Sequence, residues 1–323
     1  MEIGKDLLYL SNADVEGLGV EAGAVIDALE AMFVEKAAGR TFMKPKQHLM
    51  SPRGTAFLSM PAGMENPPYV ALKWVGIASN ERADPTLPHI SGLVTLNDYK
   101  TGMPVMVMDA RWITGLRTAA VTSVAARKLA RKDSASVGFV ACGMQARSHL
   151  ECLLVDFPIR RVVGYSRRLS TAEAFCAEVR EQGLEAEAVD DPRAAISDVD
   201  IVVTSVPILP PFDPFLDAGW MKPGAFAAMV DLGRSWHMDA AAKMDIVATD
   251  DVDQAGPKGE NMGFPRDYDA EVSDLVAGTK PGRTDDKQKT ALLFGGPALA
   301  DTAAAALVYE RAKAAGAGRV LAL

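Results

Sequence analysis

Two patterns of hydrophobic and polar positions divide the chain. Within residues 41–108, short apolar runs are broken by Pro and Gly, which is typical of an antiparallel, β-rich unit. From residue 136 onward, short apolar strands alternate with helical patterns, beginning with a strand over Ser136–Val140 and a helix over Ala146–Phe157. This alternation predicts a parallel sheet that is covered on both faces.

The remaining elements follow from the same spacings. A short strand at Leu7–Leu10 precedes a helix over Glu21–Ala38, and a long Ala-rich helix spans Trp112–Arg131. A last helix ends near Gly316, and we expect Val320–Leu323 to return to the first unit as a strand. We expect further strands at Thr55–Met60, Tyr69–Val75, Gly92–Leu96, Val105–Met108, Arg161–Tyr165, Ile201–Thr204, Gly224–Val230, Ile246–Ala248 and Ala291–Phe294, and further helices at Thr171–Gln182 and Pro297–Ala314.

A loop of small residues lies between the first strand and the first helix of the alternating region. Ala141, Gly143 and Ala146 stand at the small positions of a G-x-G-x-x-G/A loop, with Ala141 in place of the first glycine. Such a loop lets the backbone approach a pyrophosphate, which the N–H groups of the helix N-terminus then bind. An ordinary helix start is the alternative, but the strand–loop–helix context favours a dinucleotide site. We therefore assign Ala141, Gly143, Met144 and Gln145 to cofactor binding.

The end of the next strand bears on the choice of cofactor. Ser166 stands where an acidic residue normally accepts a hydrogen bond from the ribose 2′-hydroxyl of NAD. The adjacent Arg167 suits a 2′-phosphate or the adenine ring, although a solvated basic turn is the alternative. We expect NAD(H), and NADP(H) stays open. Thr204 and Ser205, where the strand Ile201–Thr204 ends, complete the expected cofactor-binding set.

These patterns predict an α/β protein with two domains. A Rossmann-type parallel-sheet domain is expected over residues 119–299, and a smaller α+β domain is expected from residues 1–118 with 300–323. A length of 323 residues suits two domains of ordinary size.

Composition excludes several other classes of protein. The net charge of −8 argues against a general nucleic-acid binder, which carries a basic face. The three cysteines and four histidines are scattered, so we expect no metal site, and we expect His149 on a helix surface. We see no secretory signal and no run of about 20 apolar residues, so we expect a cytoplasmic protein without a membrane span.

The order of short motifs resembles the ornithine cyclodeaminase/mu-crystallin family. The resemblance covers nearly the whole chain and is far more specific than the loop alone. It is carried by Lys73-Trp74-Val75-Gly76, Leu87-Pro88, Leu96-Asn97-Asp98, Thr101-Gly102-Met103-Pro104, Met108-Asp109, Thr114-Gly115-Leu116-Arg117-Thr118-Ala119-Ala120, Asp231, Gly282-Arg283-Thr284 and Asp301-Thr302-Ala303-Ala304-Ala305.

The resemblance implies a homodimeric enzyme whose first domain, rejoined by the C-terminal helix, binds substrate and dimerises. Members of the family reduce imines of amino acids, dehydrogenate alanine or cyclise ornithine. Carried over by position, Lys73 and Arg117 bind the substrate carboxylate with Lys46 nearby, and Asp231 is the catalytic acid or base. We count Lys73 as catalytic too, and Thr118 is expected to face the cofactor phosphates. Without the resemblance, a surface strand residue, a dimer ion pair and a helix cap would be the favoured interpretations of Lys73, Arg117 and Asp231.

Two departures from the family bear on the substrate. Cyclodeaminases of this family carry an acid two residues before the Met-Pro pair, to bind the distal amine of ornithine, whereas Leu58 stands there before Met60-Pro61. An apolar residue cannot bind an ammonium group, which disfavours ornithine and lysine. The presumed pocket has more cations than one substrate carboxylate requires. We therefore expect an anionic imino acid with a second carboxylate, and our best candidate is iminosuccinate, which is reduced to L-aspartate. The alternative is that some of these cations are ordinary surface residues. The cations are Lys44, Lys46, His48, Arg53, His89, Lys73 and Arg117, of which Lys46, Arg53, His89, Lys73 and Arg117 are assigned to substrate binding.

Three classes of function stay open at this point. The first is an imine reductase, whose alternatives to iminosuccinate are an alanine dehydrogenase and a cyclic ketimine reductase. The second is a cyclodeaminase, a lyase that uses NAD without net redox change and that Leu58 disfavours. The third is a non-enzymatic binding protein like mu-crystallin, which the presence of Lys73, Arg117 and Asp231 together disfavours.

Overall fold

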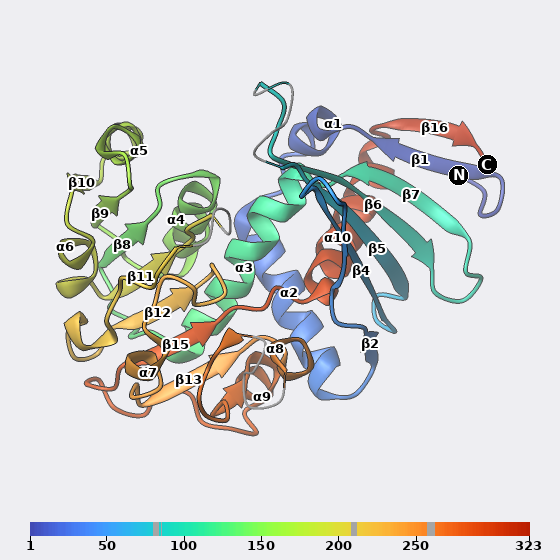
Figure 1. The fold of residues 1–323 in the computed structure, drawn as a ribbon. Helices are drawn as coiled ribbons and strands as arrows, with labels where there is room; N and C mark the ends of the chain where they lie inside the picture. Colours follow the sequence, from blue (N-terminus) through green and yellow to red (C-terminus); the bar gives the residue numbers. More distant parts are fainter. Residues whose placement is uncertain (80–83, 85, 208–211, 257–261) are drawn as a thin grey trace. The chain divides into compact units, whose positions relative to one another are not determined.

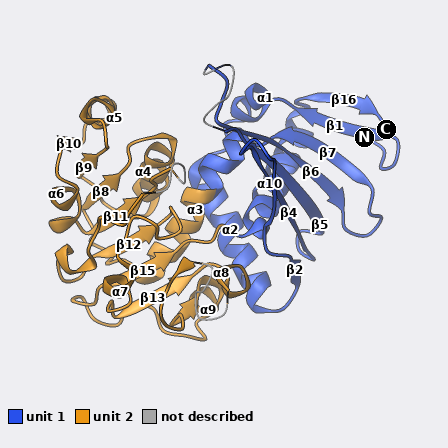
Figure 2. Cartoon of the chain, in the orientation of Figure 1, with its two compact units in different colours: residues 1–117, 297–323 blue, residues 118–296 orange. Residues whose placement is uncertain are grey.

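The computed structural model of the chain contains two compact units. It describes residues 1–79, 84, 86–207, 212–256 and 262–323. Unit 1 comprises Met1–Arg117 and Pro297–Leu323, and unit 2 comprises Thr118–Gly296 (Figure 2). The two units are built on different sheets, and each is described by itself below.

Unit 1 is a mixed sheet with two long helices, α2 (Ala22–Ala37) and α10 (Ala298–Ala315), which contact each other (Figure 1). The other helix that lies wholly in it is the short α1 (Asn12–Gly17), in the part of the chain that is described. The strands are β1 (Asp6–Leu10), β2 (Thr41–Met43), β3 (Gln47–Met50), β4 (Ala56–Met64), β5 (Tyr69–Ile77), β6 (Ile90–Asp98), β7 (Pro104–Asp109) and β16 (Arg319–Ala322). Their order is β16-β1-β7-β6-β5-β4-β2, with β3 paired to β4. Apart from the parallel pair β1 and β7, the described strands of this sheet pair in the antiparallel sense.

The alternation of β5 determines which of its side chains face the helices. Ala71, Lys73 and Val75 are buried, whereas Leu72 and Trp74 between them are exposed, as expected for a strand with one covered face. Helix α10 contacts β4, β5 and β6, and it supplies the partner of Lys73. The sheet register therefore directs one charged side chain, Lys73, into the interior of unit 1.

Unit 2 is a parallel α/β domain. Its strands are β8 (Ser136–Val140), β9 (Arg161–Tyr165), β10 (Glu185–Val189), β11 (Ile201–Thr204), β12 (Phe226–Met229), β13 (Ile246–Thr249), β14 (Ala270–Glu271) and β15 (Thr290–Leu293). They form an eight-stranded sheet of order β10-β9-β8-β11-β12-β15-β13-β14 within the described residues, and every pair in it is parallel. The intervening helices are α4 (Met144–Asp156), α5 (Leu169–Glu181), α6 (Pro192–Ser197), α7 (Met238–Ala241), α8 (Val252–Ala255) and α9 (Val272–Ala277), with a 3-10 turn at Ala218–Trp220.

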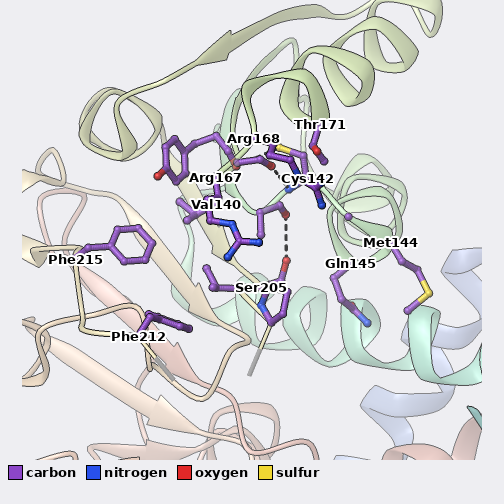
Figure 3. A pocket seen from close by; sticks show the side chains of 16 residues that line it. Val140, Cys142, Met144, Gln145, Arg167, Arg168, Thr171, Ser205, Phe212 and Phe215 are labelled. Carbon is purple, nitrogen blue, oxygen red and sulfur yellow. Dashed lines mark hydrogen bonds between the residues drawn. The ribbon is translucent and has the colours of Figure 1, made fainter. Parts of the chain in front are cut away.

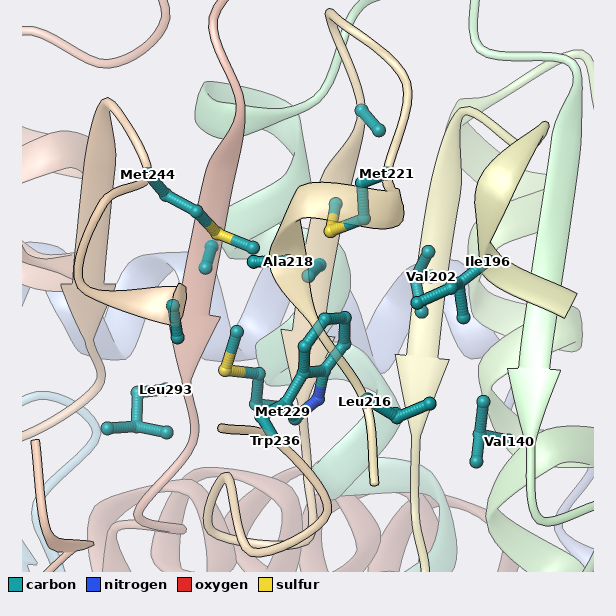
Figure 4. Packing of buried hydrophobic residues seen from close by; sticks show 14 of the residues in the cluster. Val140, Ile196, Val202, Leu216, Ala218, Met221, Met229, Trp236, Met244 and Leu293 are labelled. Atoms are coloured by element: carbon teal, nitrogen blue, oxygen red, sulfur yellow. The ribbon is translucent and has the colours of Figure 1, made fainter. Parts of the chain in front are cut away.

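One long helix, α3 (Arg111–Leu129), begins in unit 1 and ends in unit 2, since the boundary between the units falls after Arg117. The core of unit 2 includes Trp236, which is fully buried among Val140, Leu216, Met229 and Leu293 (Figure 4). Val140, Met229 and Leu293 lie at the ends of strands β8, β12 and β15, whereas Leu216 and Trp236 lie in the segments after β11 and β12. The core therefore fixes the segment that follows β12, which carries a candidate site residue.

The structure confirms the predicted α/β class and the Rossmann-type sheet. The last strand also returns to the first unit as expected, because β16 pairs with β1, with Asp6 opposite Ala322. Strands β10 and β14 were not predicted. Strand β10 has the sequence Glu-Ala-Glu-Ala-Val at a sheet edge, and β14 has two residues, so neither contains the β-branched run that marks a buried strand.

The expectation for His149 was wrong. Its side chain is fully buried in unit 2, where Nε2 lies 3.0 Å from the Thr122 hydroxyl on α3 and Nδ1 lies 2.7 Å from the Gln145 carbonyl oxygen. Burial lowers the pKa of His149 to about 4, so the ring is neutral at pH 7. The helix pattern misled because an imidazole whose two nitrogens both have partners can be buried at little cost.

Candidate active site

The loop after β8 in unit 2 has the backbone geometry of a dinucleotide-binding turn. Ala141 has a φ angle of +80°, in the left-handed region where glycine is favoured, so it takes the conformation of the glycine that it replaces. Gly143 is the N-cap of α4, and no side chain caps this helix. The N–H groups of the first turn of α4 are therefore available for an anionic ligand.

Hydrogen bonds from both neighbouring strands hold this loop in place. The Cys142 N–H donates to Ser166 Oγ at 2.9 Å, and Ser205 Oγ donates to the Ala141 carbonyl at 3.2 Å (Figure 3). Arg147 of α4 donates to the carbonyls of Cys142 and Gly143 at 3.1 and 3.0 Å. The turn is thus fixed before any ligand binds, and Ser166 and Ser205 act on the loop through its backbone.

A cavity of about 590 Å³ opens beside the loop (Figure 3). Seven residues assigned to the cofactor from the sequence line it: Ala141, Gly143, Met144, Gln145, Ser166, Arg167 and Ser205. The sequence prediction missed other lining residues, among them Arg168, Thr171, Phe212 and Phe215. Arg168 and Thr171 could have been found, since Arg168 follows Arg167 directly and Thr171 lies in the first turn of the next helix, α5. Phe212 and Phe215 lie in a loop without a recognisable pattern.

Two of the expected cofactor residues do not line this cavity. Thr118 is 5% exposed and its assignment to the cofactor phosphates stays a prediction. The assignment of Thr204 to the cofactor also stays a prediction; its side chain is fully buried, and its hydroxyl donates to Asp231 Oδ1 at 3.0 Å. Thr204 lies at the end of a strand next to β12, which directs it to the carboxylate rather than to the cavity.

Asp231 follows β12 at the carboxyl end of the sheet, where sites of α/β domains lie. Its Oδ2 accepts hydrogen bonds from Ser235 Oγ at 2.7 Å and from the Val206 N–H at 3.4 Å. The side chain is almost completely buried, and burial raises the pKa of Asp231 in spite of these donors. A carboxyl group with a raised pKa can hold a proton nearer to neutral pH, as a general acid requires.

Trp236 determines the direction of the hydrogen bond to Asp231. Its indole N–H donates to Thr204 Oγ1 at 3.1 Å, so the Thr204 hydroxyl proton is directed to the carboxylate. Leu232 and Gly233 both have positive φ angles, of 60° and 70°, which turn the chain sharply after Asp231. The buried indole and this turn together fix the orientation of the carboxyl group.

Unit 1 contains a buried cluster of three charges. Lys73 Nζ lies 2.6 Å from Asp301 Oδ1, and Arg117 Nε lies 2.9 Å from the same oxygen. Lys73 is 1% exposed, Arg117 4% and Asp301 0%. Two cations therefore share one carboxylate oxygen, which leaves the cluster with an excess of positive charge when Lys73 is protonated.

The charges in the cluster shift one another's pKa. Burial lowers the pKa of Lys73 to about 7, with a further decrease from Arg117 and an opposing increase from Asp301. Burial alone would raise the pKa of Asp301, but the charges of Arg117 and Lys73 hold it below its usual range. Lys73 can therefore exchange a proton near neutral pH, which fits its expected catalytic role.

The sequence prediction did not assign Asp301 to the site. It appeared only in the segment Asp301–Ala305, and an acid in the first turn of a helix has the simpler interpretation of favouring the helix dipole. The sequence did contain a signal for Asp301, because this acid stands among small apolar residues on a helix face that is expected to be buried.

The other expected substrate residues occupy two places in unit 1. Lys46 is half-buried just ahead of β3 and close enough to affect the pKa of both Lys73 and Asp301. Arg53 is exposed in the turn between β3 and β4, and His89 is half-buried ahead of β6. Both lie near the end of β5 at Ile77, which is four residues from Lys73, or about 13 Å along a strand.

The described residues contain no group of three or more His, Cys, Asp or Glu side chains arranged to hold a metal ion. Within the same ranges, no helix is long and apolar enough to cross a bilayer.

Comparisons with known proteins show the family and the fold of the chain. Residues 6–316 match the profile of the ornithine cyclodeaminase/mu-crystallin family. An alanine dehydrogenase of Archaeoglobus fulgidus is 33% identical over 317 residues, which is 95% of each chain. The structure of Thermococcus litoralis Δ1-pyrroline-2-carboxylate reductase with NADH and L-proline has a TM-score of 0.86 at 28% identity, covering 97% of this chain and 99% of that one. An archaeal alanine dehydrogenase dimer with bound NAD has a TM-score of 0.85 at 30% identity, covering 98% and 99%.

Proposed function

The chain belongs to the ornithine cyclodeaminase/mu-crystallin family, and from that premise we propose that it is a nicotinamide-dependent oxidoreductase, using NAD(H) or NADP(H), that interconverts an imino acid and an L-amino acid. The observation that carries this proposal is the buried cluster in which Lys73 and Arg117 share a single carboxylate oxygen of Asp301. Such a cluster has the cations that a substrate carboxylate requires, in an environment that excludes water.

The residues of unit 2 fit a dinucleotide. The left-handed turn at Ala141 and the uncapped start of α4 suit a pyrophosphate, and the adjoining cavity is large enough for an adenosine. When bound in its reduced form, the nicotinamide supplies the hydride for reduction of the C=N bond. The protein's own residues bind the substrate and move the proton.

Substrate binding is assigned to Lys73 and Arg117. Alanine and L-proline, which the names of the relatives mention, both carry a carboxylate on the carbon that bears the nitrogen. A guanidinium and an ammonium group bind such a carboxylate by charge-assisted hydrogen bonds. The carboxylate of Asp301 holds the two cations together and neutralises one of their two positive charges.

Proton transfer is assigned to Asp231. Reduction of an imine requires a proton on the substrate nitrogen, and a buried carboxyl group with a raised pKa can donate one. Thr204 and Ser235 donate to the carboxylate that is left and so hold it in a fixed orientation. In the direction of oxidation, the same carboxylate accepts the proton.

For the substrate itself, we propose iminosuccinate, which would give L-aspartate. Lys46 adds a third cation beside the Lys73–Arg117–Asp301 cluster, and a second carboxylate would balance it. Leu58 lies on the same face of β4 as Met60, the register partner of Lys73, so an apolar side chain occupies the position of the amine-binding acid of cyclodeaminases. Arg53 and His89 lie near the end of β5 and are the weaker candidates for the second carboxylate.

We further propose that unit 1 binds substrate and dimerises, that unit 2 binds the cofactor, and that the enzyme acts in the cytoplasm. Free, buried cysteines suit that reducing compartment. The dimer is supported by an apolar outer face on the sheet of unit 1, formed by Leu49, Phe57, Leu72, Trp74 and Leu93. Trp74 and Leu93 are register partners and are 43% and 47% exposed, and the Trp74 ring stacks on Phe57. A second copy of the chain would remove this face from water.

The test is a reductive assay with defined imines. Oxaloacetate with ammonia, which form iminosuccinate in solution, and pyruvate with ammonia are each mixed with the protein, and the absorbance of the reduced cofactor is followed. We expect faster oxidation of the cofactor with oxaloacetate. Faster turnover with pyruvate would replace iminosuccinate with the imine of alanine as substrate and leave the oxidoreductase assignment in place.

In the same assay, the variant Asp231→Asn tests the role of Asp231 as the acid. We expect kcat to fall by about 10²–10⁴-fold, because an amide cannot donate the proton, while cofactor affinity stays unchanged. With the wild-type protein, substrate consumption without net change in cofactor absorbance would indicate a lyase. No turnover of any imine or of ornithine by the wild-type protein would indicate a binding protein. An unchanged rate in Asp231→Asn would exclude Asp231 as the acid.

A further inference from the structure

The cavity of unit 2 has an unusual charge composition at the end of β9. Ser166, Arg167 and Arg168 follow this strand and line the cavity together with Thr171 of α5 (Figure 3). Among the described residues that line the cavity, none is Asp or Glu. The strand end at which a Rossmann-type domain normally presents an acid therefore presents a hydroxyl and two guanidinium groups.

The missing acid matters because of what it would bind. A carboxylate at this position accepts hydrogen bonds from the hydroxyls of the adenosine ribose and repels a phosphate placed there. Ser166 is neutral, and its oxygen already accepts the Cys142 N–H at 2.9 Å. This position is therefore built to hold the loop backbone, and it places no negative charge against a phosphorylated ribose.

The two arginines carry charge that the protein itself does not neutralise. Within the ranges that the structure describes, the guanidinium groups of Arg167 and Arg168 have no ion pair or hydrogen bond, and both side chains are exposed. Other arginines of unit 2 are paired, such as Arg147 with Glu178 at 2.6 Å and Arg161 with Glu187 at 2.8 Å. Two uncompensated guanidinium groups at the rim of one cavity are suited to bind a phosphate dianion.

We propose that the end of this cavity at Arg167 and Arg168 binds a 2′-phosphate on the adenosine ribose, so that the enzyme prefers NADP(H) to NAD(H). The inference rests on the proposed function, since it assigns a specificity to the same cofactor site.

The experiment measures binding without turnover. NADPH and NADH are titrated by fluorescence, and adenosine 2′,5′-bisphosphate and 5′-AMP are titrated by calorimetry to examine the adenosine end alone. We expect NADPH and the bisphosphate to bind at least about tenfold more tightly than their unphosphorylated counterparts, with a preference that weakens as salt rises.

Three variants and one control assign the effect to residues. Arg167→Ala and Arg168→Ala should each weaken NADPH binding by about tenfold and leave NADH binding nearly unchanged. Ser166→Asp should reverse the preference by repelling the phosphate. Arg160→Ala is the matched control, because Arg160 is also an exposed arginine of unit 2 but does not line the cavity.

The outcomes separate the two proposals. Equal or tighter binding of NADH, with no advantage of the bisphosphate over 5′-AMP, would overturn the phosphate site and leave the oxidoreductase proposal standing. Absence of binding by both NADH and NADPH would overturn the proposed function and this inference with it. A preference for NADPH that survives both arginine variants would refute their assignment as the phosphate ligands.

Discussion

At the scale of single residues, the feature that sets the chemistry of unit 1 is the sharing of Asp301 Oδ1 by Lys73 and Arg117. A buried pair of cations without a carboxylate would repel strongly, and removal of one partner of a buried ion cluster typically costs about 3–5 kcal/mol. Asp301 thus stabilises the fold locally and also raises the pKa of Lys73 against the effect of burial. We regard Asp301 as a positioning residue that acts through Lys73.

This role predicts a shift in the pH profile of Asp301→Asn. The pKa of Lys73 is about 7, so kcat/KM should fall as the pH rises through 7 and the ammonium group that binds the substrate carboxylate loses its proton. Without the charge of Asp301, the pKa of Lys73 decreases further, and the fall in kcat/KM should begin at lower pH. The measurement is the pH profile of kcat/KM at saturating cofactor.

A matched control for this prediction is Glu35→Gln, which also removes a carboxylate of unit 1 paired with an arginine, Arg40 at 2.8 Å. It should leave the position of the pH limb unchanged. Thermal unfolding identifies any variant that does not fold, and Asp301→Glu should restore part of the wild-type profile. A folded Asp301→Asn protein with an unshifted limb would show that Asp301 does not control Lys73.

Sequence reasoning assigned Lys73, Arg117 and Asp231 to the candidate site, because each lies in a motif with a family precedent. It could not identify Asp301 as a partner, since this residue lies 228 positions from Lys73 and the contact depends on how the last helix packs. For a similar reason, the sequence could not show that the hydroxyl of Thr204 donates to Asp231. The strand end was recognised, but the direction of the side chain depends on the buried indole of Trp236.

At the scale of elements, the loop after β8 shows how a sequence departure can preserve a backbone shape. Ala141 adopts the positive φ of the glycine that it replaces. Alanine tolerates this region at a modest cost, and a β-branched residue does not, since strained positions of this kind cost of order 1–3 kcal/mol. The pattern search therefore succeeded with an alanine in the first position because backbone shape matters more there than residue identity.

The corresponding prediction concerns substitution at this one position. Ala141→Val should lower the unfolding temperature and weaken cofactor binding by about tenfold or more, whereas Ala141→Gly should bind cofactor as the wild type does. The measurements are thermal unfolding and titration with reduced cofactor. Ala188→Val in the edge strand β10, where a β-branched residue is favoured, is the control and should change neither quantity. Wild-type affinity in Ala141→Val would mean that the turn is not part of the site.

The regular elements were predicted where hydrophobic spacing is strong, as in α2, α3, α10 and the strands β8, β9 and β11. Predicted boundaries such as Ala146 for the start of α4 fell two residues late, because the uncapped first turn has no sequence signal. The short elements β2, β3, β10, β14, α1 and α6–α9 were not predicted, since their stability comes from tertiary contacts rather than from local pattern.

At the scale of the whole molecule, unit 1 has an apolar surface that a monomer would leave exposed to water. The outer face formed by Leu49, Phe57, Leu72, Trp74 and Leu93 presents aromatic and aliphatic side chains on adjacent strands. The alternation of β5 that buries Lys73 necessarily directs Leu72 and Trp74 to this face. The same register therefore fixes both a site residue and the surface that we assign to a second copy.

The prediction is that Trp74→Arg converts a dimer into a monomer. A charged residue in the centre of the apolar face would be buried without a partner in the dimer, which costs several kcal/mol and suffices to dissociate most interfaces. Light scattering after gel filtration should give twice the chain mass of 34.4 kDa for the wild type and the single mass for the variant. Leu154→Arg is the matched control, because Leu154 is an exposed leucine of α4 in unit 2, and it should leave the mass doubled. A wild-type mass of one chain would refute the dimer, and a doubled mass in Trp74→Arg would assign the interface to another surface.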